Sequence, residues 1–438
     1  MIISFINNFI QSTSSGIGLF YLNKPVSLAL NWLSKTSIIL LVLLYSQNSF
    51  SFNDLNRINL IYKYDPDAEV QYHYKVAVAN DIATIFLRLD FNTDKVPDPD
   101  LFNISYGLSK DYTGTDQLLS DTVGSNNLIL AENNSRYYRF TVPVVKNETI
   151  VFLKVFNPNN NVEFIFDVPV DVPLQFKSSP LVLMESNRDI PIFSEYIGLH
   201  DSIRIVSVQE GVELGYFYYY SADFSPADPP MTIRQASVEK DLQVDSSATF
   251  RLGETIILHK KGLYFFQNDT TSAQGISIMV NDPYYPQFVR AENLVEPIIY
   301  ISTSREMRKV RDNEDKKKAM DIYWLELTKS PERSKKIIRD YYKQIELANY
   351  LYTSYKEGWK TDKGMIMALY GKPDAVFTDG EIEEWIYERR GGTSRISFTF
   401  VKIKSVFSDN HYELVRNKGY EREWFRIVDQ WRKGRQEI

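Results

Sequence analysis

Apolar and polar residues alternate along the chain from about residue 53 to residue 172, the pattern of strands with one buried face. In the runs 70–78 and 85–91, Val, Tyr, Ile and Leu fall at every second position. Shorter runs follow at 137–144, 149–156 and 163–168, separated by clusters of turn residues. The pattern predicts a first β-sandwich domain over residues 52–172.

A second group of short apolar runs lies between residues 173 and 286. We expect strands at 203–208, 214–220, 255–259, 263–267 and 276–280. The stretch 225–230 contains three prolines and reads as a loop, because proline cannot donate to a β-ladder. These runs predict a second β-sandwich domain over 173–286.

The apolar spacing changes to a helical period after residues 287–304, which we read as a linker. Apolar positions three and four apart predict helices at 306–327, 331–355 and 422–433. Alternating runs between them predict strands at 382–389, 396–400 and 412–416. The expected third domain, 305–438, is therefore α+β, with two long helices, a short helix, a small antiparallel sheet and a C-terminal helix.

The segment Gly358-Trp359-Lys360-Thr361-Asp362 lies between two of the predicted helices. Gly358 falls where the long helix should end, and we expect it to be left-handed there. Trp359 would fold back on the last helical turn. Thr361 would cap the next helix, and Asp362 would complement its dipole. The segment is thus interpreted as a structural corner, with ligand binding by Asp362 and Thr361 as the alternative.

The short helix after this corner should cover residues 362–370. Gly371 and Pro373 follow it in the order expected at a helix end. Trp385 and Tyr387 belong to the strand at 382–389. Neighbouring Glu383 and Glu384 should point to opposite faces of this strand, so they cannot act as a catalytic carboxylate pair.

The N-terminal 51 residues read as a targeting segment. An apolar run at 38–44 follows Lys35, and small residues at Ser49 and Ser51 fit a cleavage site before Phe52. Residues 1–51 are therefore predicted to be a signal peptide, with a retained N-terminal anchor as the alternative. The protein is therefore expected to be exported.

The absence of cysteine excludes disulfides, thiol catalysis and a lipid-bearing cysteine, so a lipoprotein is not expected. The four histidines are scattered along the sequence without ligand spacing. We therefore predict no metal site and no cofactor.

The ordered set of residues in the last third of the chain resembles the GWxTD-domain family. Besides Gly358–Asp362, the matching positions include Trp324, Tyr370-Gly371, Pro373-Asp374, Trp385, Tyr387, Trp424 and Trp431. The resemblance implies an exported Gram-negative envelope protein, located in the periplasm or associated with the outer membrane. The family has no established enzymatic role. Residues 362–416 also resemble, over a shorter stretch, the SmpA/OmlA lipoprotein of outer-membrane assembly.

Three functions remain open on these grounds. The first is a non-catalytic protein that binds envelope or outer-membrane proteins, motivated by the export segment, the β modules and the lack of a catalytic constellation. The second is a carbohydrate- or peptidoglycan-binding module, motivated by the aromatic run 216–220. The third is a hydrolase using Asp362 with Glu383 or another acid. The sequence has no array of basic and aromatic residues, so we do not predict binding to nucleic acid.

Overall fold

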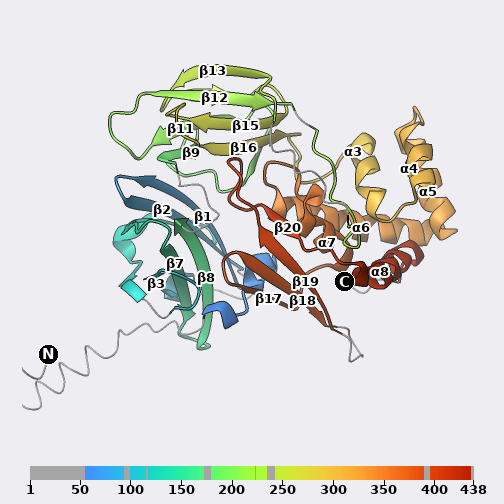
Figure 1. The fold of residues 1–438 in the computed structure, drawn as a ribbon, viewed down its shortest axis with the longest axis horizontal. Coiled ribbons are helices and arrows are strands. Elements are labelled where there is room, and N and C mark those ends of the chain that lie inside the picture. Colours follow the sequence, from blue (N-terminus) through green and yellow to red (C-terminus); the bar gives the residue numbers. More distant parts are fainter. Residues whose placement is uncertain are drawn as a thin grey trace, which may run out of the picture. The chain divides into compact units, whose positions relative to one another are not determined.

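The computed structural model describes residues 55–92, 99–114, 117–171, 179–221, 223–233, 242–388 and 395–435. The predicted targeting segment, residues 1–51, lies outside the described residues. Two mainly antiparallel β regions precede a C-terminal region of helices and one small sheet (Figure 1). This order confirms the predicted fold class.

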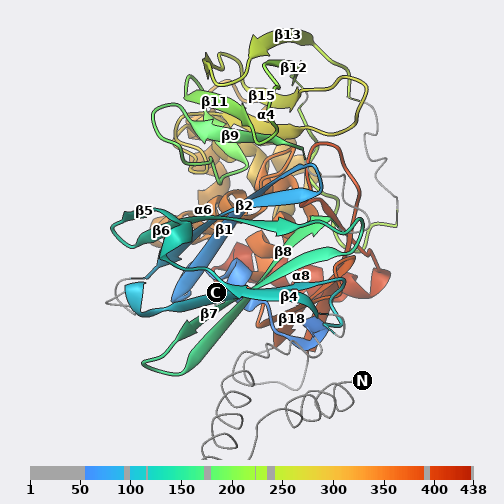
Figure 2. The same ribbon diagram turned by 90° about the vertical axis from the view of Figure 1, so that its left-hand side faces the viewer.

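The first β region contains two four-stranded antiparallel sheets (Figure 2). One has the order β1 (Val70–Ala79), β2 (Ile82–Phe91), β6 (Ser135–Pro143), β5 (Leu128–Glu132). The other has the order β4 (Gln117–Thr122), β3 (Asn103–Ser109), β7 (Thr149–Asn157), β8 (Val162–Asp171). Alternate side chains of both sheets share one apolar core that includes Ile85, Leu87, Val151 and Phe166. This sharing is the packing of a β-sandwich.

The second β region contains a five-stranded and a three-stranded sheet. The larger has the order β10 (Tyr196–Gly198), β16 (Ile276–Asn281), β15 (Gly262–Gln267), β12 (Leu214–Tyr220), β13 (Ser246–Arg251). The smaller has the order β14 (Thr255–Ile257), β11 (Ser202–Ser207), β9 (Leu181–Glu185). Only the β10–β16 pair is parallel among the strand pairs of the described residues. Leu183, Ile203, Phe266 and Ile278 join the two sheets in one core.

The C-terminal region packs its helices and one sheet around a single core. Its helices are α3 (Ala291–Val295), α4 (Ser304–Arg311), α5 (Lys316–Thr328), α6 (Pro331–Tyr352), α7 (Asp362–Tyr370) and α8 (Glu421–Lys433). Its sheet has the order β17 (Ala375–Thr378), β18 (Ile382–Glu388), β19 (Arg395–Lys402), β20 (Tyr412–Leu414). Within the described residues, every helix is too short or too polar to cross a membrane.

Two details of this region differ from the predictions. The single helix expected at 306–327 is two helices, because Asp315 caps a new one by accepting from the Lys318 amide at 2.9 Å. The expected linker, 287–304, forms α3 and a 3₁₀ turn (Glu296–Tyr300), and it buries Val295 and Ile298 in the C-terminal core. An apolar spacing of three or four cannot locate a break of this kind.

The segment just before β1 belongs to two cores. Leu60 and Tyr64 are buried in the C-terminal core, although they lie at the start of the first predicted domain. The Leu60 amide donates to Val376 of β17 at 2.8 Å. Tyr62 instead contacts Phe164 of β8 with ring centroids 5.1 Å apart. This segment therefore ties the first β region to the C-terminal region within the compact unit 52–438.

Candidate functional site

The Gly358–Asp362 segment forms a buried corner between α6 and α7. Helix α6 ends at Tyr352, and a 3₁₀ turn (Gly358–Lys360) leads into α7. Gly358 does not have a positive φ. The prediction that it is a left-handed helix end is therefore wrong, because α6 ends several residues earlier, at Tyr352.

A close backbone approach explains glycine at this position. A Cβ on Gly358 would lie 2.7 Å from the Asn349 Cα and closer still to the Ala348 carbonyl oxygen. A Cβ on Gly364 would overlap the Gly358 carbonyl oxygen. Both glycines thus let α7 approach the last turns of α6.

Replacing Gly358 with alanine should destabilise the protein by about 1–3 kcal/mol or more, because rigid backbone would have to move. Chemical denaturation of residues 52–438 measures this loss. The matched control is Gly124→Ala, since a Cβ there meets nothing within 4 Å. Equal stabilities of the two variants would show that the backbone near Gly358 shifts to accept a Cβ at little cost.

Trp359 anchors the corner. Its side chain is 1% exposed. Its amide donates to Asn349 Oδ1 at 3.1 Å, and its carbonyl accepts from the Tyr300 hydroxyl at 2.9 Å. The ring meets the Tyr300 ring edge-on, with centroids 5.9 Å apart. The tryptophan thus packs between α6 and the segment before α4.

Thr361 and Asp362 both act inside the protein. Thr361 caps α7, as predicted, by accepting from the Gly364 amide at 2.9 Å. The Asp362 carboxylate accepts from the Leu414 amide at 2.7 Å and from both terminal nitrogens of Arg416, at 2.6 and 3.1 Å. This basic partner of Asp362 could not be predicted, because Arg416 is 54 residues away in the chain. The ion pair joins α7 to the end of β20.

Replacing Asp362 with asparagine should cost about 1.5–3 kcal/mol, the range for buried hydrogen bonds to a charged group. This exceeds the loss expected from a helix dipole alone. Thermal melts beside a cellular complementation assay test the claim. A variant that melts like the wild type but has lost function would show that Asp362 serves a ligand.

The other predicted positions are also built into the core. Gly371 ends α7 with a φ of 73°, and its carbonyl accepts from the Tyr387 hydroxyl at 2.9 Å. Pro373 is buried two residues later. Trp385 is fully buried, and its indole nitrogen donates to Glu383 at 2.6 Å.

A buried ion pair beside the motif escaped the sequence analysis. Lys363 Nζ lies 2.9 Å from Glu383 Oε1, with side chains 4% and 2% exposed. The Tyr64 hydroxyl donates to the same carboxylate at 2.8 Å. Lys363 Nζ also lies 3.4 Å from the centroid of the Tyr412 ring. The sequence gives only a weak indication of this ion pair, because a single lysine after the motif and a single glutamate in a strand look like surface residues.

The charge state of this pair follows from its donors. Burial raises the pKa of Glu383, but the charges of Lys363 and Lys63 and the donated hydrogen bonds outweigh it, and the pKa is lowered overall. Burial lowers the pKa of Lys363 to about 8, against the opposing charge of Glu383. The lowered pKa of Glu383 favours its charged form, whereas the lowered pKa of Lys363 favours its neutral form. Because Lys363, Tyr64 and Trp385 all donate to the Glu383 carboxylate, we infer that the pair is ionised at neutral pH.

The free energy of unfolding should therefore fall at low pH, where Glu383 takes up a proton. A carboxyl with a lowered pKa in the folded state stabilises the protein above its ordinary pKa of 4.5, and this contribution is lost as pH falls through the folded value. Glutamine at this position keeps an acceptor oxygen for the Lys363, Tyr64 and Trp385 donors and loses only the charge. We therefore expect Glu383→Gln to cost about 1.5–3 kcal/mol at pH 7 and progressively less below pH 4.5. Denaturation at several pH values measures the difference. A constant difference down to pH 3 would contradict it, and Glu384→Gln is the control.

A second ion pair, between half-buried Lys63 and buried Asp167, lies on the first β region. Lys63 Nζ is 2.8 Å from Asp167 Oδ1, and the Tyr112 hydroxyl donates to Asp167 Oδ2 at 2.8 Å. Burial lowers the pKa of Lys63, but the charge of Asp167 raises it overall. Because Lys63 adjoins Tyr64, the two pairs flank the segment that ties the two regions together.

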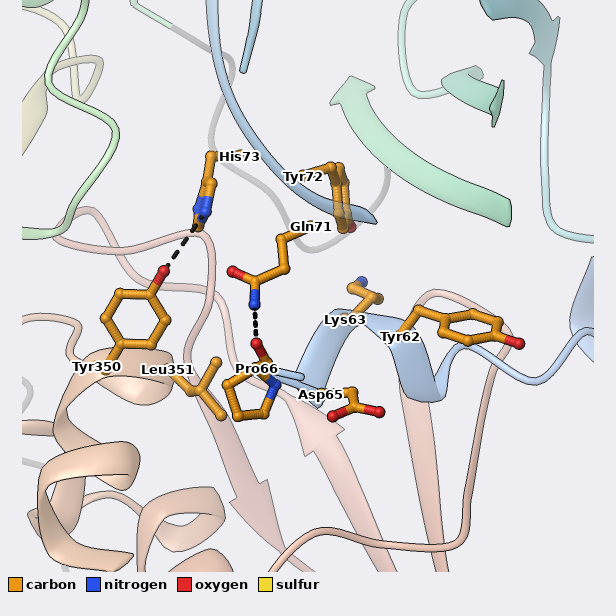
Figure 3. A pocket seen from close by; sticks show the side chains of 9 residues that line it. All are labelled: Tyr62, Lys63, Asp65, Pro66, Gln71, Tyr72, His73, Tyr350 and Leu351. Atoms are coloured by element: carbon orange, nitrogen blue, oxygen red, sulfur yellow. Dashed lines mark hydrogen bonds between the residues drawn. The ribbon is translucent and has the colours of Figure 1, made fainter. Parts of the chain in front are cut away.

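The hollow next to Lys63 has a cavity volume of about 30 Å³ (Figure 3). Lys63, Tyr72, His73 and Tyr350 are among its lining side chains, and His73 Nε2 lies 3.5 Å from the Tyr350 hydroxyl. This volume is of the order of a single water molecule. The hollow is thus too small for a substrate.

The aromatic run on β12 packs on both faces of its sheet. Phe217 and Tyr219 join the core of the second β region. Tyr218 and Tyr220 pack with Phe265 in another cluster, on the opposite face. Tyr216, Phe217 and Tyr218 are half-buried, and Tyr219 and Tyr220 are buried, so most of the aromatic surface of this run packs inside the protein.

The carboxylates proposed for hydrolysis do not form a pair. Asp362 binds Arg416, whereas Glu383 binds Lys363. Glu383 is buried and Glu384 is half-buried, as expected for opposite faces of β18. Each acid is held by its own cation.

Comparison with solved structures gives no fold assignment. HBP35 of Porphyromonas gingivalis matches 49% of this chain with 11% identity and a TM-score of 0.18, and the match spans 64% of that protein. The structure of Dpr11 IG1 bound to DIP-gamma IG+IG2 matches 48% of this chain and 98% of that one, with 9% identity and a TM-score of 0.14. No curated protein matches the sequence.

The family comparison agrees with the resemblance seen in the sequence. Residues 262–433 match the sequence profile of the GWxTD domain. The match begins at β15, well before the motif itself, and ends at the last residue of α8. The chain is therefore a protein with a GWxTD domain.

Proposed function

We propose that this protein is an exported, non-catalytic component of the bacterial cell envelope that binds other envelope proteins at the periplasmic face of the outer membrane. The observation that carries the proposal is the use of the motif. Gly358, Trp359, Thr361 and Asp362 all make their contacts within the protein. Because these motif residues are used for packing inside the protein, we infer that other surfaces of the protein bind its partners. This arrangement supports a scaffold role.

The β regions and the helices would supply those surfaces. Large apolar side chains are exposed on separate elements, among them Ile82 (50%) on β2 and Phe425 (55%) on α8. Single exposed apolar residues are common on any protein, so they nominate positions for an experiment rather than an interface.

Photo-crosslinking in the native host tests the proposal. A photoreactive amino acid would replace Ile82 or Phe425, with exposed Arg422 on the same helix as the matched control for Phe425. We expect a discrete crosslinked envelope protein from at least one apolar position, and less from the control. Absence of any specific product from every position would count against a binding role.

Export is tested separately. N-terminal sequencing of the protein from its host should find a start near Phe52. A chain that keeps residues 1–34 would refute cleavage and leave the anchor alternative. Glycan binding remains the competing function, and sedimentation with isolated peptidoglycan would detect it.

A further inference from the structure

Two histidines that are far apart in the sequence meet on the surface of the second β region. His200 lies in the turn between β10 and β11, and His259 follows β14. Their Nδ1 atoms are 3.2 Å apart, and the ring centroids are 5.4 Å apart. Both residues are exposed. The two histidines are 59 residues apart in the sequence, so their spacing in the chain gave no sign of this contact.

The two turns hold the rings in place. The His200 amide donates to the Leu258 carbonyl at 3.1 Å, which ties one turn to the other. Leu258 is 3% exposed and anchors its turn in the core. His200 has a φ of 73°, a conformation that few non-glycine residues adopt. A residue kept in such a conformation at a surface is a reason to look for a role.

We propose that His200 and His259 form a binding site for a divalent transition-metal ion of the zinc, copper or nickel class. Zinc binds imidazole nitrogen at about 2.0–2.1 Å, so two ligands of a tetrahedral site are about 3.3 Å apart. The observed 3.2 Å separation of the Nδ1 atoms matches this value. Imidazole suits these metals better than magnesium or calcium.

The site would have two protein ligands and open positions. Among the described residues, no group of three or more His, Asp and Glu side chains gathers around a metal position. Water or a ligand from another molecule would complete the coordination. The neighbouring ammonium groups are engaged elsewhere: Lys261 pairs with Asp282, and Lys260 lies 5.4 Å from the centroid of the Tyr219 ring.

The competing interpretation is a hydrogen bond between the rings, in which one Nδ1 carries the proton and the other accepts it. Ligation through both Nδ1 atoms instead requires both protons on Nε2. The two states therefore differ in the tautomer of one ring. Adding metal would move that proton from Nδ1 to Nε2 without a net change of charge on the imidazoles.

Metal titration of residues 52–438 tests the site, using zinc chloride in competition with a chromophoric chelator. We expect one equivalent to bind, and His200→Asn or His259→Gln to weaken binding by at least about tenfold. Asparagine tolerates a positive φ, so the first variant should keep the turn. His73→Gln, which lies outside the pair, should bind like the wild type.

Nitrogen-15 NMR of the imidazole rings provides the second measurement. Zinc should give both rings the Nε2–H tautomer in the wild type. Binding that survives both substitutions, or ring signals that zinc leaves unchanged, would overturn the proposal and leave a hydrogen-bonded pair. Because these outcomes do not depend on an envelope partner, they are independent of the proposed function.

Discussion

Replacing Lys363 with methionine should destabilise the protein by about 3–5 kcal/mol, the usual loss when one partner of a buried ion pair is removed. The variant would leave Glu383 in the core with only the Tyr64 and Trp385 donors. It would also remove the cation that lies over the Tyr412 ring.

A simple limit supports this magnitude. Glu383 can escape the penalty by taking up a proton, and doing so at pH 7 from an ordinary pKa of 4.5 costs about 3.4 kcal/mol. Methionine fills most of the volume of the lysine stem, so the cavity contribution should be small.

Urea denaturation followed by tryptophan fluorescence measures the loss. All tryptophans after residue 52 lie between Trp324 and Trp431, so the signal reports on the C-terminal region. The matched control is the double variant Lys363→Met with Glu383→Gln, which removes both charges and should recover much of the stability. If the single and double variants were equally unstable, the loss would come from packing and not from an unpaired charge.

The corner and the buried pair show how far the sequence could be read. Helix α7 was predicted with its observed bounds, because Thr361, Asp362, Gly371 and Pro373 are local signals of helix ends. The strands followed from their alternation, which records burial on one face of a sheet. These features depend on residues close in the chain.

What the sequence could not provide were contacts between distant segments. Gly358 was interpreted from its position after a helix, yet its cause is the approach of Ala348 and Asn349. The partner of Asp362 is 54 residues away, and Tyr64 lies 319 residues from Glu383. No local pattern marks such pairs in one sequence.

The same limit explains the N-terminal segment. Leu60 and Tyr64 were assigned to the first β domain because they precede β1 in the chain. Their side chains are buried in the core of the C-terminal region instead. A short apolar stretch without a clear period does not reveal the core it joins. A GWxTD region expressed without residues 55–64 would lack part of its core.

Replacing Trp359 with alanine should cost about 3–5 kcal/mol, the range for deleting a large buried aromatic ring. The side chain is 1% exposed, and α6, α7 and Tyr300 enclose it. The backbone hydrogen bonds to Asn349 and Tyr300 would survive in alanine. The loss would therefore report on the ring and the cavity it leaves.

A phenylalanine at this position separates volume from polarity. Among the described residues, the indole nitrogen of Trp359 has no hydrogen-bond partner although it is buried. Trp359→Phe keeps one aromatic ring and removes that unpaired donor, so it should cost clearly less than Trp359→Ala. Phe425→Ala, at an exposed position of α8, is the control and should change the free energy of unfolding by less than about 0.5 kcal/mol.

Thermal and urea denaturation followed by circular dichroism measure all three variants, since this signal does not depend on the tryptophan itself. A cellular complementation assay of the same variants then decides whether the corner has a role beyond folding. If the motif is structural, function should fall in the same order as stability, with alanine worse than phenylalanine. A Trp359→Phe protein that stays folded but loses function entirely would show that the indole ring serves a partner directly.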